Sequence, residues 1–134
     1  MQTSRLFYNL ILGLTVLVLS SCSVLFPPKP DQLAGLWAEN WQAPDVTYSD
    51  TYRISKTAEG NWVINAPERK DYDCSKVAFD GKQLNFTVTI KDLKYGQEDS
   101  WVRYALTLQG RGKILKGKAN TKAGQTFNVV WNKK

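Results

Sequence analysis

Histidine is absent from this chain of 134 residues, and cysteine occurs only twice, as Cys22 and Cys74. Without histidine, the Ser–His and Cys–His pairs that activate nucleophiles cannot form, and zinc sites with histidine ligands are excluded. The acidic residues are scattered, as at Asp71 and Asp73, and charged loops are a more common use of such residues than acid–base catalysis. We therefore expect no enzyme activity, no metal and no cofactor.

The chain also lacks an apolar run long enough to span a membrane. Its most apolar stretch, residues 6–19, is interrupted by polar and small residues, and it is shorter than the roughly 20 residues that a spanning helix needs. Arg5 precedes this stretch, as in the positively charged start of a secretory leader. The pattern predicts a signal peptide over residues 1–21, and an uncleaved transmembrane anchor is the alternative.

The apolar run ends in Leu19-Ser20-Ser21-Cys22, an aliphatic residue, two small residues and a cysteine. This tetrapeptide resembles the bacterial lipobox. The resemblance implies that the Cys22 thiol receives a diacylglyceryl group, that a peptidase cuts just before it, and that the protein is a lipid-anchored lipoprotein of the cell envelope. Ser23 follows the cysteine where an aspartate would favour the inner membrane, so the resemblance favours the outer membrane, facing the periplasm.

After the cysteine, prolines at positions 27, 28 and 30 predict an extended tether within residues 22–32. Residues 33–134 are then long enough for one domain. The net charge of +6 suits an anionic surface such as lipid headgroups, or it only keeps the domain soluble. Nucleic acid is not expected as a partner of an exported protein.

Period-two alternation of apolar and polar residues dominates the domain. On the first predicted strand it places Trp37, Glu39 and Trp41 on one side. The predicted strands are residues 35–41, 47–56, 62–66, 75–79 and 84–90, followed by strands around 102–108, 115–119 and 126–132. Eight short strands with tight turns predict an all-β fold, a small antiparallel up-and-down barrel. An open β-sandwich is the alternative.

One hairpin can be assigned a register from the sequence. Asp80-Gly81 favours a two-residue type I′ turn, which pairs Val77 with Leu84. This register sets Cys74 opposite Thr87 on the outer face. Cys74 is then either a small apolar residue packed into the domain or an exposed thiol that pairs between chains. The residues of the second strand that this register directs inward are Leu84, Phe86, Val88 and Ile90.

Gly35-Leu36-Trp37 resembles the G-x-W opening of lipocalins, and segments 81–86 and 115–119 resemble the hairpins of small bacterial lipocalin-like domains. The resemblance implies that Trp37 is a structural plug at one end of an eight-stranded barrel. Lys133 stands where lipocalins usually have an arginine over this tryptophan. The resemblance also implies binding of a small hydrophobic molecule, a lipid or a protein partner.

Tyr52, Trp62 and Tyr104 are the candidate ligand-binding residues, because each combines an apolar ring with a polar tip. Two functions remain open. The first is a binding module for a small apolar ligand or lipid. The second is a surface-acting envelope protein, such as an inhibitor, scaffold or assembly accessory, with a filled barrel. The small inward residues Gly117 and Ala119 favour a filled interior.

Overall fold

The structure, a computed structural model, describes residues 29–41, 49–91 and 100–134. The predicted signal peptide, Cys22 and most of the predicted tether therefore lie outside the described residues, as do residues 47 and 48 of the second predicted strand. No helix in the described part is long and apolar enough to cross a membrane. The elements are η1 (Pro30–Leu33), β1 (Gly35–Trp41), β2 (Thr51–Lys56), β3 (Trp62–Asn65), β4 (Tyr72–Phe79), β5 (Gln83–Ile90), β6 (Ser100–Gln109), η2 (Gly110–Gly112), β7 (Ile114–Thr121) and β8 (Thr126–Lys133).

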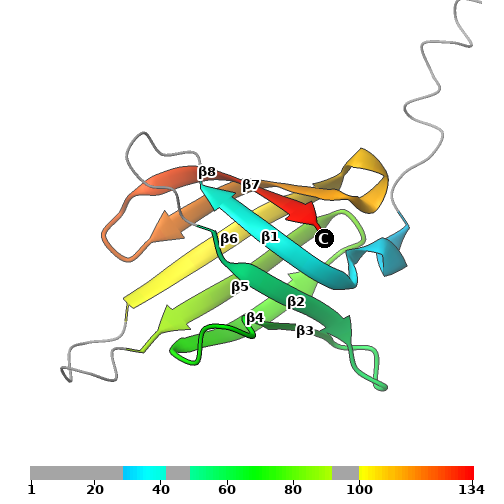
Figure 1. Ribbon diagram of the computed structural model, residues 1–134, viewed down its shortest axis with the longest axis horizontal. Coiled ribbons are helices and arrows are strands. Elements are labelled where there is room, and N and C mark those ends of the chain that lie inside the picture. Colours follow the sequence, from blue (N-terminus) through cyan, green and yellow to red (C-terminus); the bar gives the residue numbers. More distant parts are fainter. Residues whose placement is uncertain (1–28, 42–48, 92–99) are drawn as a thin grey trace, which may run out of the picture.

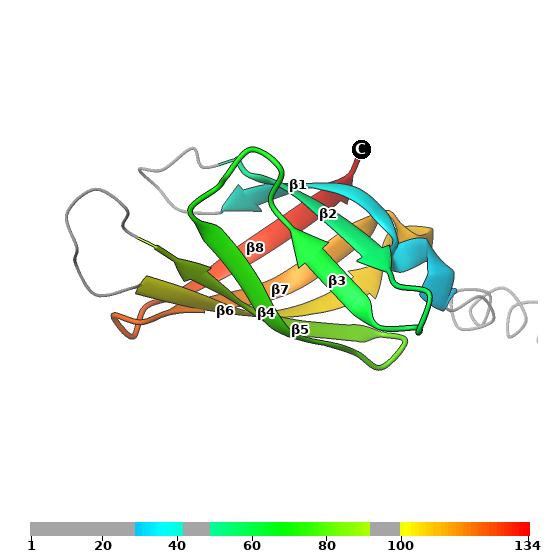
Figure 2. The same cartoon turned by 90° about the horizontal axis from the view of Figure 1, so that it is seen from below.

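The strands form one antiparallel sheet in the order β3-β2-β1-β8-β7-β6-β5-β4. Because β1 is hydrogen-bonded to β8, the first and last strands of the chain lie side by side. The sheet curls until its two edge strands, β3 and β4, approach each other (Figures 1 and 2). The fold is thus a nearly closed up-and-down barrel, which confirms the predicted architecture and excludes the open sandwich.

The seam between β3 and β4 is covered by aromatic side chains. Trp62 meets Phe79 edge to face, with ring centroids 5.6 Å apart and an interplanar angle of 87°. The ammonium group of Lys56 lies 5.3 Å from the Trp62 ring centroid. Rings packed across the seam shield the two sheet edges, which would otherwise expose unpaired backbone groups.

One end of the barrel is closed by Trp37, which is fully buried and donates its indole N–H to the Leu33 carbonyl oxygen at 2.9 Å. The Lys133 ammonium lies 5.4 Å from the Trp37 ring centroid and donates to the Gln32 carbonyl oxygen. Lysine here supplies the cation that the resemblance assigns to an arginine. Helices η1 and η2 lie together at this end (Figure 1).

The inward faces of the central strands are as predicted. On β5, Leu84, Phe86 and Val88 are buried, and Ile90 packs against the core. Alternation therefore identifies the inner face even where strand boundaries differ, as in β4, which begins three residues before its predicted start at 75. The buried residues of the later strands are Val102, Tyr104, Leu106, Leu108, Leu115, Ala119, Val129 and Trp131.

The predicted register of the β4–β5 hairpin is wrong. Leu84 pairs with Phe79 and not with Val77. The turn is longer than two residues because the Asp80 carboxylate accepts hydrogen bonds from the backbone N–H groups of Lys82 and Gln83, at 2.8 and 2.7 Å. A side chain that satisfies nearby backbone groups in this way stabilises a wider turn.

Further along β4, a bulge between Ser75 and Ala78 places one extra residue in the strand. Lys76 lies within it and adopts a positive φ of 54°. The bulge shifts the alternation, so Cys74 pairs with Val88 and not with Thr87. Cys74 accordingly packs, half-buried, against the core, and burial raises the pKa of its thiol to about 12. A protonated thiol is a poor nucleophile, so the packed role fits better than pairing between chains.

Candidate functional site

A cavity of about 240 Å³ lies inside the barrel at the end opposite Trp37. The register defines this position: Trp37 pairs with Lys133 at the closed end, whereas Trp41, which lines the cavity, pairs with Val129. The walls come from β1, β2, β4, β5, β6 and β8. The lining residues are Glu39, Trp41, Asp50, Tyr52, Tyr72, Val88, Ile90, Val102, Tyr104 and Phe127.

The floor of the cavity is made of stacked aromatic rings. Tyr52 stacks on Trp131 with ring centroids 4.4 Å apart, and Phe86 stacks on Tyr104 with centroids 4.7 Å apart. The two stacks meet edge to face where Phe86 approaches Trp131, at 5.6 Å. Below this floor the barrel is filled by buried aliphatic side chains, including Leu106 and Leu115. The interior therefore has a packed half and a hollow half.

Glu39 lies on the cavity wall and has no solvent-exposed surface. One carboxylate oxygen, Oε1, accepts a hydrogen bond from the Tyr104 hydroxyl at 2.6 Å. The other, Oε2, is buried with no hydrogen-bond partner within the described part of the chain. Burial raises the pKa of Glu39 to about 7; Asp50 adds to the rise, while the Tyr104 hydroxyl and the indole N–H groups of Trp131 and Trp41 oppose it.

Asp50 is the second acid of the cavity and is 8% exposed. Its carboxylate accepts a hydrogen bond from the Tyr72 hydroxyl at 3.0 Å and forms an ion pair with Arg69 at 3.3 Å. The Arg69 guanidinium also pairs with Asp71 and lies 4.0 Å from the Tyr72 ring centroid. Asp50 therefore has a cationic partner, which it shares with Asp71.

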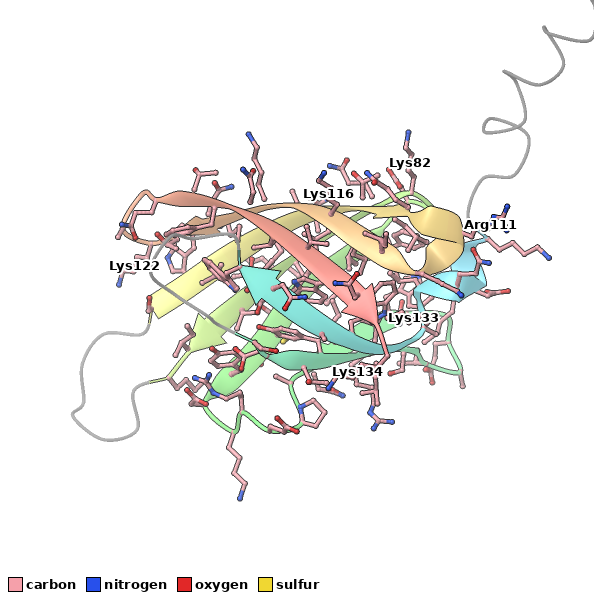
Figure 3. The ribbon with its side chains drawn as sticks, turned by 45° about the horizontal axis from the view of Figure 1, so that its top comes forward. Lys82, Arg111, Lys116, Lys122, Lys133 and Lys134 are labelled. Atoms are coloured by element: carbon pink, nitrogen blue, oxygen red, sulfur yellow. The ribbon has the colours of Figure 1, made fainter. Side chains whose placement is uncertain are left out.

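The charge of the cavity is opposite to that of the molecule. Within the described ranges, Glu39 and Asp50 are the only buried charged side chains, although the whole chain carries a net charge of +6. Lys82, Lys116 and Lys122 project away from the barrel interior (Figure 3). The buried charge is thus negative and lies in the hollow half, whereas these lysines lie on the outside.

The sequence-predicted residues are placed in different parts of the barrel. Tyr52 and Tyr104 both line the cavity, on strands β2 and β6. Trp62 is half-buried at the seam, against Phe79, and does not belong to the cavity wall. Trp37 closes the opposite end. The structure therefore brings two of the three candidate ligand-binding residues together.

Neither Glu39 nor Asp50 is among the residues predicted from the sequence. A signal for Glu39 is nevertheless present, because alternation places it between Trp37 and Trp41 on the inner face of β1. A charged residue on an apolar face needs a partner or a function. Asp50 carries a similar signal, because in the predicted strand 47–56 it alternates with the inward residues Tyr52 and Ile54. Its backbone carbonyl oxygen accepts a hydrogen bond from the Glu39 backbone N–H at 2.8 Å, which places the two acids side by side.

No group of three or more acidic, cysteine or histidine side chains that could hold a metal ion occurs in the described segments. Comparison with protein families, with curated proteins and with solved structures finds no match. The class of the protein is therefore defined by its fold and cavity: a small, nearly closed eight-stranded barrel with an aromatic, acidic hollow at one end.

Proposed function

We propose that this protein is a lipid-anchored lipoprotein of the bacterial cell envelope whose lipocalin-like barrel binds one small, largely apolar molecule. The observation that carries the proposal is the cavity of about 240 Å³, whose wall is mostly aromatic and aliphatic. Sites of this kind, apolar with a few polar groups, are typical of small-molecule binding. Tyr52 and Tyr104 are the proposed ligand contacts predicted from the sequence.

The volume of the cavity limits the size of the ligand. A cavity of about 150 Å³ can hold benzene, and drug-sized ligands occupy sites of about 300–1,000 Å³. The observed volume of about 240 Å³ lies between these values. The proposed ligand is therefore about the size of one ring with a short substituent, and a long acyl chain would not fit.

The proposed anchor agrees with the position of the cavity. The lipobox resemblance puts the lipid on Cys22, and the described chain enters the barrel through η1 at the closed end. The cavity lies at the other end. A barrel tethered in this way has its binding site away from its point of attachment.

Ligand binding can be tested by titrating the protein with tert-butylbenzene and following the indole N–H signals by NMR. We expect saturable binding, since this neutral molecule matches the size and polarity of the cavity. Val102→Phe adds a ring to the cavity wall and should weaken binding at least about tenfold. Val63→Phe, on the exposed outer face of β3, is the matched control. Absence of saturable binding both for this molecule and for its charged isostere phenyltrimethylammonium, or equal loss in both variants, would contradict the proposal.

A surface-acting envelope protein is the second candidate, and the charge distribution supports it. Residues 100–134 contain no Asp or Glu, and Lys116 and Lys118 are exposed on β7. Such a surface suits an anionic partner such as lipid headgroups. Native mass spectrometry of the protein extracted from its own cells distinguishes the candidates: a small-molecule adduct favours the first, and a protein or phospholipid complex formed without such an adduct favours the second.

A further inference from the structure

We propose that the ligand is a small organic cation, with an apolar or aromatic body and a positively charged nitrogen that pairs with Glu39. This inference rests on the proposed function, because it requires that the cavity is a ligand site. It adds the chemical class of the ligand, which the volume alone leaves open.

The composition of the wall is the first argument. The cavity is lined by five aromatic, three aliphatic and two acidic residues, and none of the described lining residues is basic. Aromatic faces attract cations through their negative π surface, most strongly when the cation is removed from water. The cavity therefore offers a desolvated organic cation two stabilising interactions: cation–π contacts with the rings and an ion pair with a carboxylate.

Glu39 is the second argument. Its side chain is completely buried, and Oε2 makes no hydrogen bond of ordinary geometry in the described residues. The nearby indole N–H groups of Trp131 and Trp41 lower the pKa of this carboxyl, but they do not offset the effect of burial. A buried carboxylate with an unsatisfied oxygen is costly unless a positive group pairs with it. A neutral apolar ligand would leave that cost in place, whereas a charged nitrogen near Oε2 would remove it.

Asp50, the more exposed acid at the rim of the cavity, already has a cationic partner, unlike Glu39. The Asp50 carboxylate is paired with Arg69, and this guanidinium already lies 4.0 Å from the Tyr72 ring centroid. The rim thus contains one cation held between a carboxylate and an aromatic face. Glu39, deeper in the cavity, has the same surroundings of acid and rings, with no Lys or Arg on the cavity wall.

An anionic ligand fits the same surroundings poorly. Two acidic side chains lie on the wall, and a buried like charge close to Glu39 would be strongly unfavourable. The net positive charge of the chain does not alter this, because Lys82, Lys116 and Lys122 point away from the interior (Figure 3). Lys133 lies over Trp37 at the opposite, closed end.

A matched pair of probes tests the inference. Phenyltrimethylammonium and tert-butylbenzene have the same shape, but only the first carries a charge. It is permanent, so any pH dependence of its binding comes from the protein. At pH 8.5 we expect the cation to bind the full-length protein at least about tenfold more tightly than the neutral isostere.

The pH of the titration supplies a test that needs no variant. Lowering the pH from 8.5 to 5.5 protonates Glu39, whose pKa is about 7, and should weaken binding of the cation about tenfold. The other titratable groups facing Glu39 are Asp50, paired with Arg69, and Tyr52 and Tyr104. Burial raises the pKa of both tyrosines above their ordinary value, so they stay neutral throughout. Binding of tert-butylbenzene should not fall over the same range.

Glu39→Gln keeps the size of the side chain and removes its charge. In this variant the preference for the cation and its pH dependence should both disappear, while Glu59→Gln, on an exposed turn, should leave both unchanged. If the neutral probe binds and the cation binds no better, the inference fails and the proposed function stands. If neither probe binds, both fail. A preference for the cation that persists in Glu39→Gln also overturns the role of Glu39.

Discussion

Glu39 is held in the folded barrel with its carboxylate removed from water, and this has a consequence for stability. Burial is the largest influence on its pKa, which rises from 4.5 to about 7. A group whose folded pKa is raised binds more protons in the folded state than in the unfolded state. Without a cationic ligand, the folded protein should therefore lose stability as this group ionises.

Glu39→Gln should remove a fall in stability between about pH 4.5 and 7. Below this window the acid is protonated in both states; within it, only the unfolded chain ionises. The wild-type free energy of unfolding should then drop by about 3 kcal/mol and level off above pH 7. We expect the Gln variant to resist urea better than wild type at pH 8 and similarly at pH 4. Equal pH profiles for wild type, Glu39→Gln and the exposed control Glu59→Gln would contradict this explanation.

At the scale of strands, the sequence allows the inner and outer faces to be predicted but not every register. Alternation places Phe86 and Tyr104 inward because each strand has one face on the core. The register of β4 depends instead on the Asp80 carboxylate and on the bulge at Lys76, and neither leaves a periodic signal. Tertiary contacts also decide the role of Trp62. It lies on the edge strand β3, so its ring packs against Phe79 of β4 at the seam and does not line the cavity.

Gly117 shows a second limit of reasoning from strands alone. Its inward position suggests a crowded interior, but a Cβ atom there would collide with the backbone carbonyl oxygen of Ala105 and approach Leu106 Cα to 2.9 Å. The obstacle is thus the backbone of the adjacent strand β6, in which Leu106 pairs with Gly117. Glycine in a strand often marks such a close approach or a tight bend in a barrel.

Gly117→Ala should therefore destabilise the barrel by about 1–3 kcal/mol, the usual cost of overpacking, because backbone cannot move aside as a flexible side chain can. Urea denaturation followed by tryptophan fluorescence measures this change. Lys116→Ala, at the neighbouring exposed position of β7, is the control and should change stability by less than about 0.5 kcal/mol. If Gly117→Ala and the control unfold at the same urea concentration, the prediction is wrong, and β6 and β7 can move apart at little cost.

For the whole molecule, eight alternating segments and tight turns are enough to predict a barrel, since closure removes exposed sheet edges. They are not enough to predict a cavity at one end only. That division depends on how the stacks of Tyr52 with Trp131 and of Phe86 with Tyr104 meet across the interior. The contacts that Trp131 makes with Tyr52 and Phe86 join strands far apart in the sequence, so no local pattern records them.

The proposed orientation, with the lipid at the closed end and the cavity at the other, depends on Cys22. Cys22→Ser removes the thiol that the lipobox resemblance assigns to lipidation, so we expect an uncleaved precursor that incorporates no labelled fatty acid. Cys74→Ser is a matched control, because Cys74 packs half-buried in the barrel, and this variant should be processed and labelled normally. The two proteins are compared by metabolic acyl labelling, membrane fractionation and intact mass. Normal cleavage and labelling of Cys22→Ser would remove the anchor from the proposal while leaving the binding site of the barrel untouched.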